Sequence, residues 1–163
     1  MKKVLTIKTH SEDETIELAR KLTCKLQKRG LIALIGELGS GKTVFAKGVA
    51  KAVNYKDYSY VNSPSFVVMK EYSGDCKLYH YDVYRLEAES FHDTLDYERY
   101  FYGDGITVVE WANKIEAYLP EEYIEVKIGY VDKTERSFSI KAYGDKNKKL
   151  VKEFSKDYEN FSI

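Results

Sequence analysis

The chain has 163 residues, a length that fits one domain over residues 1–163 and buries about two-thirds of the unfolded chain's surface. Lysine plus arginine number 26, as do aspartate plus glutamate, so no overall positive field would hold nucleic acid unaided. Two cysteines are too few for a disulfide framework or a zinc site, which favours buried, reduced thiols. No apolar run approaches the roughly 20 residues of a membrane span, so we expect a cytosolic protein.

The first predicted elements are a strand and a helix. Residues 4–8 alternate between apolar and polar side chains, as a half-buried strand does. Ser11 and Glu14 then have the spacing of a capping box, in which two side chains satisfy free N–H groups at a helix start. Apolar residues follow at helical spacing, and Gly30 is expected to end this helix.

A strand, a glycine-rich loop and a second helix come next. Residues 31–35 form a continuous apolar run that is short enough for a buried strand. After the loop, apolar side chains recur at helical spacing over residues 44–53. This order of elements is typical of a P-loop.

The middle of the chain is predicted to hold three more strands. The break at residues 62–65 precedes an aromatic and β-branched run at 66–71, and residues 77–82 alternate similarly. A polar stretch over 86–100 is compatible with helix. A buried strand follows at 106–110. Another helical segment is expected at residues 112–118.

The last strands are expected at 123–129 and 137–142, where two alternating runs can form a hairpin. The predicted fold is therefore an α/β P-loop NTPase. Its mixed, mostly parallel sheet would be flanked by helices and carry antiparallel strands at one edge. The lysine-rich tail at 146–163 has weak periodicity and is given no assigned structure.

The glycine-rich loop carries the most specific chemical signal. It matches G-x-x-x-x-G-K-[ST], in which glycines let backbone N–H groups converge on phosphate oxygens at a helix N-terminus. Lys42 would neutralise phosphate charge and Thr43 would hold magnesium. The alternative is a glycine-rich structural turn. The residues expected to contact a nucleotide here are Glu37, Leu38, Gly39, Ser40, Gly41, Lys42, Thr43 and Val44.

A P-loop also needs an acidic partner for the metal, usually at the end of a neighbouring buried strand. Glu110 follows four β-branched residues at 106–109, so its strand is expected to be central and to deliver the carboxylate to the phosphate-binding edge. The alternative is a solvated glutamate at a strand end.

A cluster at residues 80–85 places an imidazole, a carboxylate and a guanidinium close together in sequence. His80 and Asp82 would share one face of an extended chain, with Arg85 just beyond. Such a cluster can position an attacking water beside a γ-phosphate. On spacing alone, a structural hydrogen-bonded cluster explains the pattern equally well.

Together these segments resemble the TsaE (YjeE) family of bacterial ATPases, which take part in threonylcarbamoyl modification of adenosine in tRNA. The family pattern combines a Walker A loop with V-T-S-P-T-F, H-x-D-x-Y-R and E-W segments in that order. This chain has V-N-S-P-S-F at 61–66, H-Y-D-V-Y-R at 80–85 and the pair Glu110 and Trp111. The resemblance covers roughly residues 4–142.

The resemblance implies roles for several residues. Thr43 and Glu110 would attend magnesium, Asp82 and Lys42 would be catalytic, and the segment 61–66 would form a switch-like loop. The family also places nucleotide contacts near the first helix and on a late strand, which makes Ser11 and Arg136 candidates, although capping and surface charge explain them equally. Further candidates are Ser63, Ser65, His80, Arg85 and Trp111.

The implied cofactors are ATP or ADP and Mg²⁺. The resemblance implies an ATPase that acts on the complex of the proteins TsaD and TsaB and is weak without them. It would reach tRNA mainly through that complex, in agreement with its neutral charge. Two alternatives remain open at this point. One is a small P-loop kinase of a metabolite, and the other is a nucleotide-responsive binding module with negligible turnover.

Overall fold

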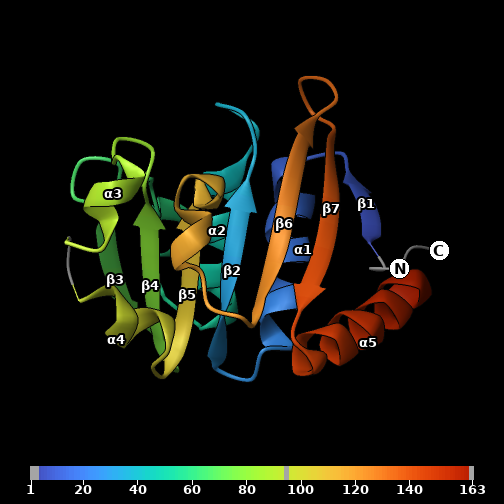
Figure 1. The fold of residues 1–163 in the computed structure, drawn as a ribbon. Helices are drawn as coiled ribbons and strands as arrows, with labels where there is room; N and C mark the ends of the chain where they lie inside the picture. The colour runs from blue at the N-terminus through green and yellow to red at the C-terminus, as the bar shows by residue number, and fades with distance from the viewer. Residues whose placement is uncertain (1–3, 94–95, 162–163) are drawn as a thin grey trace.

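A single mixed sheet lies at the centre of the computed structural model, which describes residues 4–93 and 96–161 (Figure 1). Its strands are β1 (Leu5–Thr9), β2 (Arg29–Ile35), β3 (Met69–Ser73), β4 (Lys77–Asp82), β5 (Gly105–Glu110), β6 (Tyr123–Tyr130) and β7 (Arg136–Tyr143). They lie in the order β1-β7-β6-β2-β5-β4-β3. The neighbours β6, β2, β5 and β4 are parallel, which confirms the predicted α/β class with a mixed, mostly parallel sheet.

Antiparallel pairing occurs at both edges of the sheet. The hairpin of β6 and β7, with β1 beside it, forms one edge as predicted. At the other edge β3 also pairs antiparallel with β4, a pairing that the sequence did not indicate. Three residues separate β3 from β4, and so short a connection can only return the chain antiparallel.

Helices cover both faces of the sheet (Figure 1). The helices α1 (Glu12–Cys24), α2 (Lys42–Ala52) and α5 (Asp145–Phe161) contribute to one hydrophobic core. The short helices α3 (Ala88–Phe91) and α4 (Tyr97–Phe101) and the 3₁₀ segment η2 (Ala112–Tyr118) contribute to a second core on the other face. A further 3₁₀ turn, η1 (Tyr58–Tyr60), follows α2.

The central strands are apolar because both of their faces are covered. All six residues of β5 are buried, as are the four at 31–34 in β2. In a parallel sheet with helices on both sides, this burial favours continuous apolar runs over alternation. Strand β2, which leads into the glycine-rich loop, and strand β5, which ends at Glu110, are therefore both buried within the fold.

Two predicted boundaries were wrong. The first helix ends at Cys24, and Gly30 lies inside β2, because Gln27 and Lys28 take left-handed φ angles of 53° and 70° and turn the chain first. The strand expected at 66–71 starts at Met69. Pro64 begins a tight turn here, in which its carbonyl accepts a 2.7 Å hydrogen bond from the Val68 N–H.

In the remaining segments the structure defines elements that the sequence did not specify. The stretch at 86–100 contains α3 and the start of α4, with residues 94 and 95 outside the described part of the chain. The segment at 112–118 is a kinked 3₁₀ helix, and the unassigned tail forms α5. Cys24 is exposed and Cys76 partly exposed, so the expectation of buried thiols was wrong, although both are free. Within the described residues, none of the helices has the length and apolar character needed to cross a membrane.

Candidate nucleotide-binding site

The glycine-rich loop joins the end of β2 to the start of α2. Gly39 and Gly41 take φ angles of 78° and 107°, a region that other residues rarely adopt. Gly41 is the N-cap of α2, and its carbonyl accepts the first helical hydrogen bond from Phe45 at 3.0 Å. The loop therefore has the backbone form that turns N–H groups toward an anion at a helix N-terminus.

Lys42 lies against this loop, with 6% of its surface exposed. Its ammonium donates to the carbonyls of Gly36 and Glu37 at 2.7 and 2.8 Å, and lies 4.0 Å from the centre of the Trp111 ring. Burial lowers the pKa of this ammonium, while nearby acids, led by Glu110, oppose the shift. Trp111 has a left-handed backbone with φ of 63° directly after β5.

Glu110 is held at the end of β5 with 1% of its surface exposed. Its Oε1 accepts a 2.7 Å hydrogen bond from the Thr43 hydroxyl, and its Oε2 lies 3.6 Å from His80 Nε2. Burial alone would raise the pKa of Glu110. The nearby imidazole of His80, with Asp82 and Thr43, more than offsets that effect, so the pKa lies below its usual value. Thr43 and Glu110, which the resemblance places at magnesium, are therefore in contact.

Asp82 ends β4 directly beside Glu110, because the two residues are register partners across the parallel pair of strands. One carboxylate oxygen accepts from the Ser63 hydroxyl and the other accepts a 2.9 Å hydrogen bond from the Tyr84 N–H. Burial, opposed by these two hydrogen bonds, raises the pKa of Asp82 above its usual value. Both of its oxygens are thus engaged away from the glycine-rich loop.

The segment at 61–68 folds against Asp82 through a strained turn. Val68 has a φ angle of 69°, which is unfavourable for a β-branched residue. It is the central residue of a three-residue turn, in which the Met69 N–H donates to the Val67 carbonyl at 2.8 Å. The Val68 carbonyl in turn accepts from the Asp82 N–H at 2.8 Å. Phe66 is 83% exposed, and the guanidinium of Arg85 lies 4.2 Å from its ring centre.

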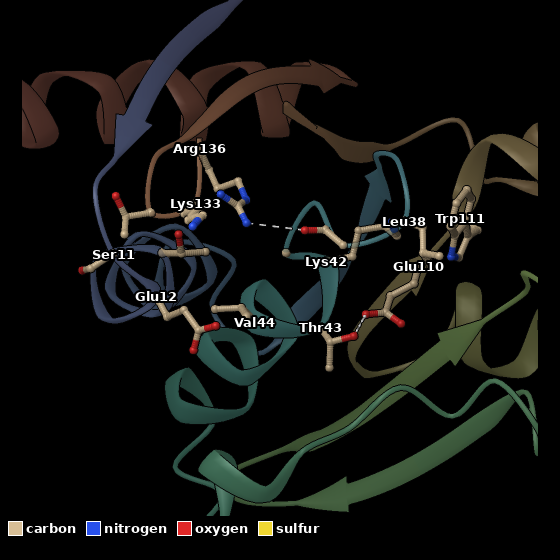
Figure 2. A pocket seen from close by; sticks show the side chains of 14 residues that line it. Ser11, Glu12, Leu38, Lys42, Thr43, Val44, Glu110, Trp111, Lys133 and Arg136 are labelled. Carbon is tan, nitrogen blue, oxygen red and sulfur yellow. Dashed lines mark hydrogen bonds between the residues drawn. The ribbon is translucent and has the colours of Figure 1, made fainter. Parts of the chain in front are cut away.

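A cavity of about 440 Å³ opens over the glycine-rich loop. Figure 2 shows Lys133 and Arg136 on one side of the loop and Glu110 and Trp111 on the other. The cavity is therefore formed by the start of α1, the loop, the end of β5 and the β6–β7 turn. Its lining consists of Ser11, Glu12, Thr15, Leu38, Gly39, Gly41, Lys42, Thr43, Val44, Glu110, Trp111, Lys133, Thr134 and Arg136.

Ser11 and Arg136, distant in sequence, meet at this cavity. The Ser11 hydroxyl caps α1 by accepting a 3.1 Å hydrogen bond from the Glu14 N–H, so the predicted cap is present. Arg136 donates from Nε to the Ser40 carbonyl at 3.0 Å and stacks its guanidinium 4.6 Å from the Tyr130 ring centre. Arg136 thus links β7 to the glycine-rich loop.

The predicted site residues fall into two groups. Most of the loop residues, with Ser11, Glu110, Trp111 and Arg136, line the cavity. Asp82 and His80 lie behind it around Glu110, and Arg85 is directed to Phe66. Glu37, Ser40, Ser63 and Ser65 are also outside the lining. Sequence reasoning missed Glu12, Thr15, Lys133 and Thr134; the only available signal was their proximity to Ser11 and Arg136.

The residues around Thr43 fit a magnesium ion that is shared with a ligand. Among the described residues, no cluster of three or more His, Cys, Asp or Glu side chains could hold a metal alone. One hydroxyl and one carboxylate, held 2.7 Å apart at the cavity, are instead available. This donor set suits Mg²⁺, which usually takes one or two protein oxygens and completes its shell with phosphates and water.

Comparisons with known proteins give a consistent family. A model described as threonylcarbamoyl adenosine biosynthesis protein TsaE matches residues 9–138. The chain is 40% identical to the tRNA threonylcarbamoyladenosine biosynthesis protein TsaE of Bacillus subtilis, over 98% of this chain and 99% of that protein. The protein of that name from Aquifex aeolicus is 41% identical, over 64% of this chain and 74% of its own length. A crystal structure of Bacillus subtilis YdiB superposes with a TM-score of 0.78 and 36% identity, covering 96% of this chain and 97% of that one.

Proposed function

This chain belongs to the TsaE family of threonylcarbamoyl adenosine biosynthesis proteins, and from that premise we propose that it is the Mg²⁺-dependent ATPase of this tRNA modification. The observation that carries the proposal is the part-buried contact of Thr43 with Glu110 beside Lys42, in the lining of a cavity over a glycine-rich loop. It works in the cytosol on the pathway that makes threonylcarbamoyladenosine in tRNA.

The phosphates of ATP or ADP bind at the glycine-rich loop, where the positive φ angles of Gly39 and Gly41 give the backbone its anion-binding form. Lys42 leaves the carbonyls of Gly36 and Glu37 and turns to the phosphate oxygens, a stronger partner for an ammonium. Thr43 and Glu110 hold Mg²⁺, which supplies charge neutralisation on the β- and γ-phosphates.

The nucleoside occupies the part of the cavity between α1 and the β6–β7 turn. Glu12 offers acceptors for ribose or base donors, and Lys133 and Thr134 offer donors from the opposite wall. The acidic first turn of α1, which contains Glu12, Asp13 and Glu14, would repel phosphate. This negative charge sets the orientation of the nucleotide, with the phosphates at the glycine-rich loop and the nucleoside near α1.

Asp82 positions the attacking water during hydrolysis. In the structure its carboxylate oxygens accept from the Ser63 hydroxyl and from the Tyr84 N–H, and the first of these bonds ties Asp82 to the 61–68 segment. The isolated chain is expected to be a weak ATPase, and contact with partner proteins would stimulate it by moving this segment and with it Asp82. By family resemblance these partners are TsaD and TsaB.

Contact with tRNA is made mainly through those partners. The 26 basic and 26 acidic residues leave the chain without the net positive charge that neutralises a phosphate backbone. The nucleotide site is also too small and too recessed to admit a polynucleotide strand, since its cavity of about 440 Å³ suits a single small ligand.

Release of free phosphate tests the function. ATP and MgCl₂ are incubated with the chain alone, and with purified TsaD and TsaB, and both free phosphate and phosphorylated small molecules are measured. We expect free phosphate that rises with the partners. Phosphorylated metabolite would identify a P-loop kinase, and binding without turnover in either condition would identify a nucleotide-responsive binding module.

In the same assay, the variant Lys42→Ala tests the phosphate site, because it removes the charge that faces the phosphates. Phosphate release should fall by about 10²-fold or more, because donors aimed at developing charge contribute at least this much. Lys149→Ala, on the exposed face of α5, is the matched control and should behave as wild type. Normal turnover in Lys42→Ala would exclude the glycine-rich loop as the phosphate site.

A further inference from the structure

His80 is the one buried imidazole of the chain, and the reaction outlined above gives it no task. It is 0% exposed, and neither ring nitrogen has a hydrogen-bond partner among the residues that the structure describes. Buried side-chain nitrogens are nearly always paired, because an unpaired one forfeits its hydration without compensation. The unpaired state of His80 therefore needs an explanation.

A carboxylate oxygen of Glu110 lies close to His80. The Nε2 atom of His80 lies 3.6 Å from Glu110 Oε2, while Glu110 Oε1 accepts from Thr43 at 2.7 Å. The first distance is outside hydrogen-bonding range and the second is inside it. Thr43 thus holds one oxygen of the carboxylate, and His80 faces the other from the opposite side.

The sheet fixes this arrangement. His80 and Asp82 are two residues apart on β4, so they share a face, and their register partners on β5 are Val108 and Glu110. His80 therefore lies level with Val108, two residues before Glu110, on the face of the sheet that α2 covers. Its ring packs beside Tyr72, with 6.5 Å between ring centres, which limits its freedom to turn elsewhere.

We propose that His80 is a positioning residue that donates from Nε2 to Glu110 Oε2 when Mg²⁺ and nucleotide bind, fixing the carboxylate between the imidazole and Thr43. A movement of about 0.6 Å brings the two atoms to a normal hydrogen-bond distance. At 3.6 Å this bond is unmade, and ligand binding would complete it. The inference rests on the proposed function, since it assumes a magnesium nucleotide at Thr43.

Partners behind the ligands of a metal orient those ligands, and their removal typically lowers metal affinity by about 10- to 100-fold. His80→Leu, which keeps an apolar side chain of similar volume, should weaken Mg²⁺ binding in the presence of ADP by this factor. His80→Gln, which keeps a donor, should stay within about threefold of wild type. Binding of ADP in EDTA should be unchanged in both variants.

Trp111 supplies the readout. It is the single tryptophan of the chain, directly follows Glu110 and lies 4.0 Å from the Lys42 ammonium. Its fluorescence should therefore change when phosphate draws Lys42 away, and again when Mg²⁺ binds at Glu110. The titrations use MgCl₂ added to protein with saturating ADP. Thr107→Val is the matched control, because Thr107 is a buried polar residue of β5 that bonds the Tyr100 carbonyl away from the site.

A second measurement tests the inference even if the His80 variants fail to fold. The chain has three histidines, and His10 and His92 have side chains that are 65% and 54% exposed, so His10→Gln with His92→Gln leaves one imidazole signal. In ¹⁵N-labelled protein, MgADP should shift the Nε2 resonance of His80, whereas ADP in EDTA should not.

The outcomes separate this inference from the proposed function. If wild type shows no nucleotide-dependent change in Trp111 fluorescence, the nucleotide site itself is wrong. If wild type binds MgADP but His80→Leu binds Mg²⁺ equally well, or the Nε2 resonance does not move, His80 only fills space and the inference is overturned. Loss of metal affinity in Thr107→Val as well would also overturn it, since any buried polar change would then have the same effect.

Discussion

Glu110 and Asp82 are neighbouring carboxylates whose pKa values are shifted in opposite directions. Both are buried, with 1% and 4% of their surface exposed. The pKa of Glu110 is held down, chiefly by His80 against the effect of burial, while burial raises the pKa of Asp82. When the environments of two neighbouring acids separate their pKa values, one acid can stay charged while the other accepts or donates a proton. We therefore propose metal binding for Glu110 and water positioning for Asp82.

Glu110→Gln tests the first assignment. A neutral amide is a poorer magnesium partner than a carboxylate, so Mg²⁺-dependent phosphate release should fall sharply while ADP binding in EDTA stays near wild type. Titration of MgCl₂ in the phosphate assay measures the effect. Glu121→Gln, an exposed glutamate before β6, is the control, and an unchanged magnesium requirement in Glu110→Gln would remove Glu110 from the site.

Asp82→Asn tests the second assignment. Groups that position or deprotonate water typically contribute about 10²- to 10⁴-fold, so partner-stimulated phosphate release should drop by at least the lower figure. Asparagine can still meet Ser63 and the Tyr84 N–H, so the melting temperature should change little. Asp104→Asn, whose side chain is 99% exposed, serves as control. A large loss of stability with intact turnover per folded molecule would indicate a structural role instead.

The sequence predicted the residues whose chemistry fixes both type and spacing. Lys42 and Thr43 are recognisable because phosphate and magnesium binding need those side chains at the start of a helix. Lys133 and Thr134 were missed because a turn residue enters the site only through the pairing of β6 with β7, which no local pattern encodes. Separate roles for Asp82 and Glu110 were expected from the family resemblance, but the opposite shifts of their pKa values depend on partners from other elements.

At the scale of elements, α5 shows how composition can hide a helix. Its apolar residues Leu150, Val151 and Phe154 are spaced as one helical face and pack into the core with α1 and α2. Lysines fill the exposed positions between them, so the segment reads as a charged tail when hydrophobic content is judged alone. The turn at Pro64 hides a strand boundary similarly, because Phe66, Val67 and Val68 are of types that favour strands but lie in the turn before β3.

Phe154→Ala tests whether α5 belongs to the core. Phe154 is 1% exposed, and truncation of a buried phenylalanine costs about 3–5 kcal/mol in free energy of unfolding. Urea denaturation should report a loss of this size. Lys152→Ala on the exposed face should stay within about 0.5 kcal/mol of wild type. Equal, small effects from both variants would mean that α5 contributes little to the fold.

At the scale of the whole molecule, equal numbers of acidic and basic residues limit what the chain can bind by charge alone. We expect fluorescence anisotropy with labelled tRNA, at about 150 mM salt, to show binding no tighter than the weak end of the non-specific range, about 10⁻⁴ M. Addition of TsaD and TsaB should bring tRNA and this chain into one complex. Micromolar binding by the chain alone, falling steeply with salt, would contradict this expectation and direct attention to the lysines of α5.

The strand order has a consequence for synthesis of the protein. The first strand, β1, pairs with the last, β7, and the nucleotide cavity joins Ser11 to Arg136. While the ribosome is still translating the middle of the chain, β1 has no partner and the cavity lacks one wall. Pairing over such a sequence separation is slow and comes late in folding. A nascent chain should therefore acquire the ability to bind nucleotide only after β7 has emerged, so that ATP never stabilises an incomplete molecule.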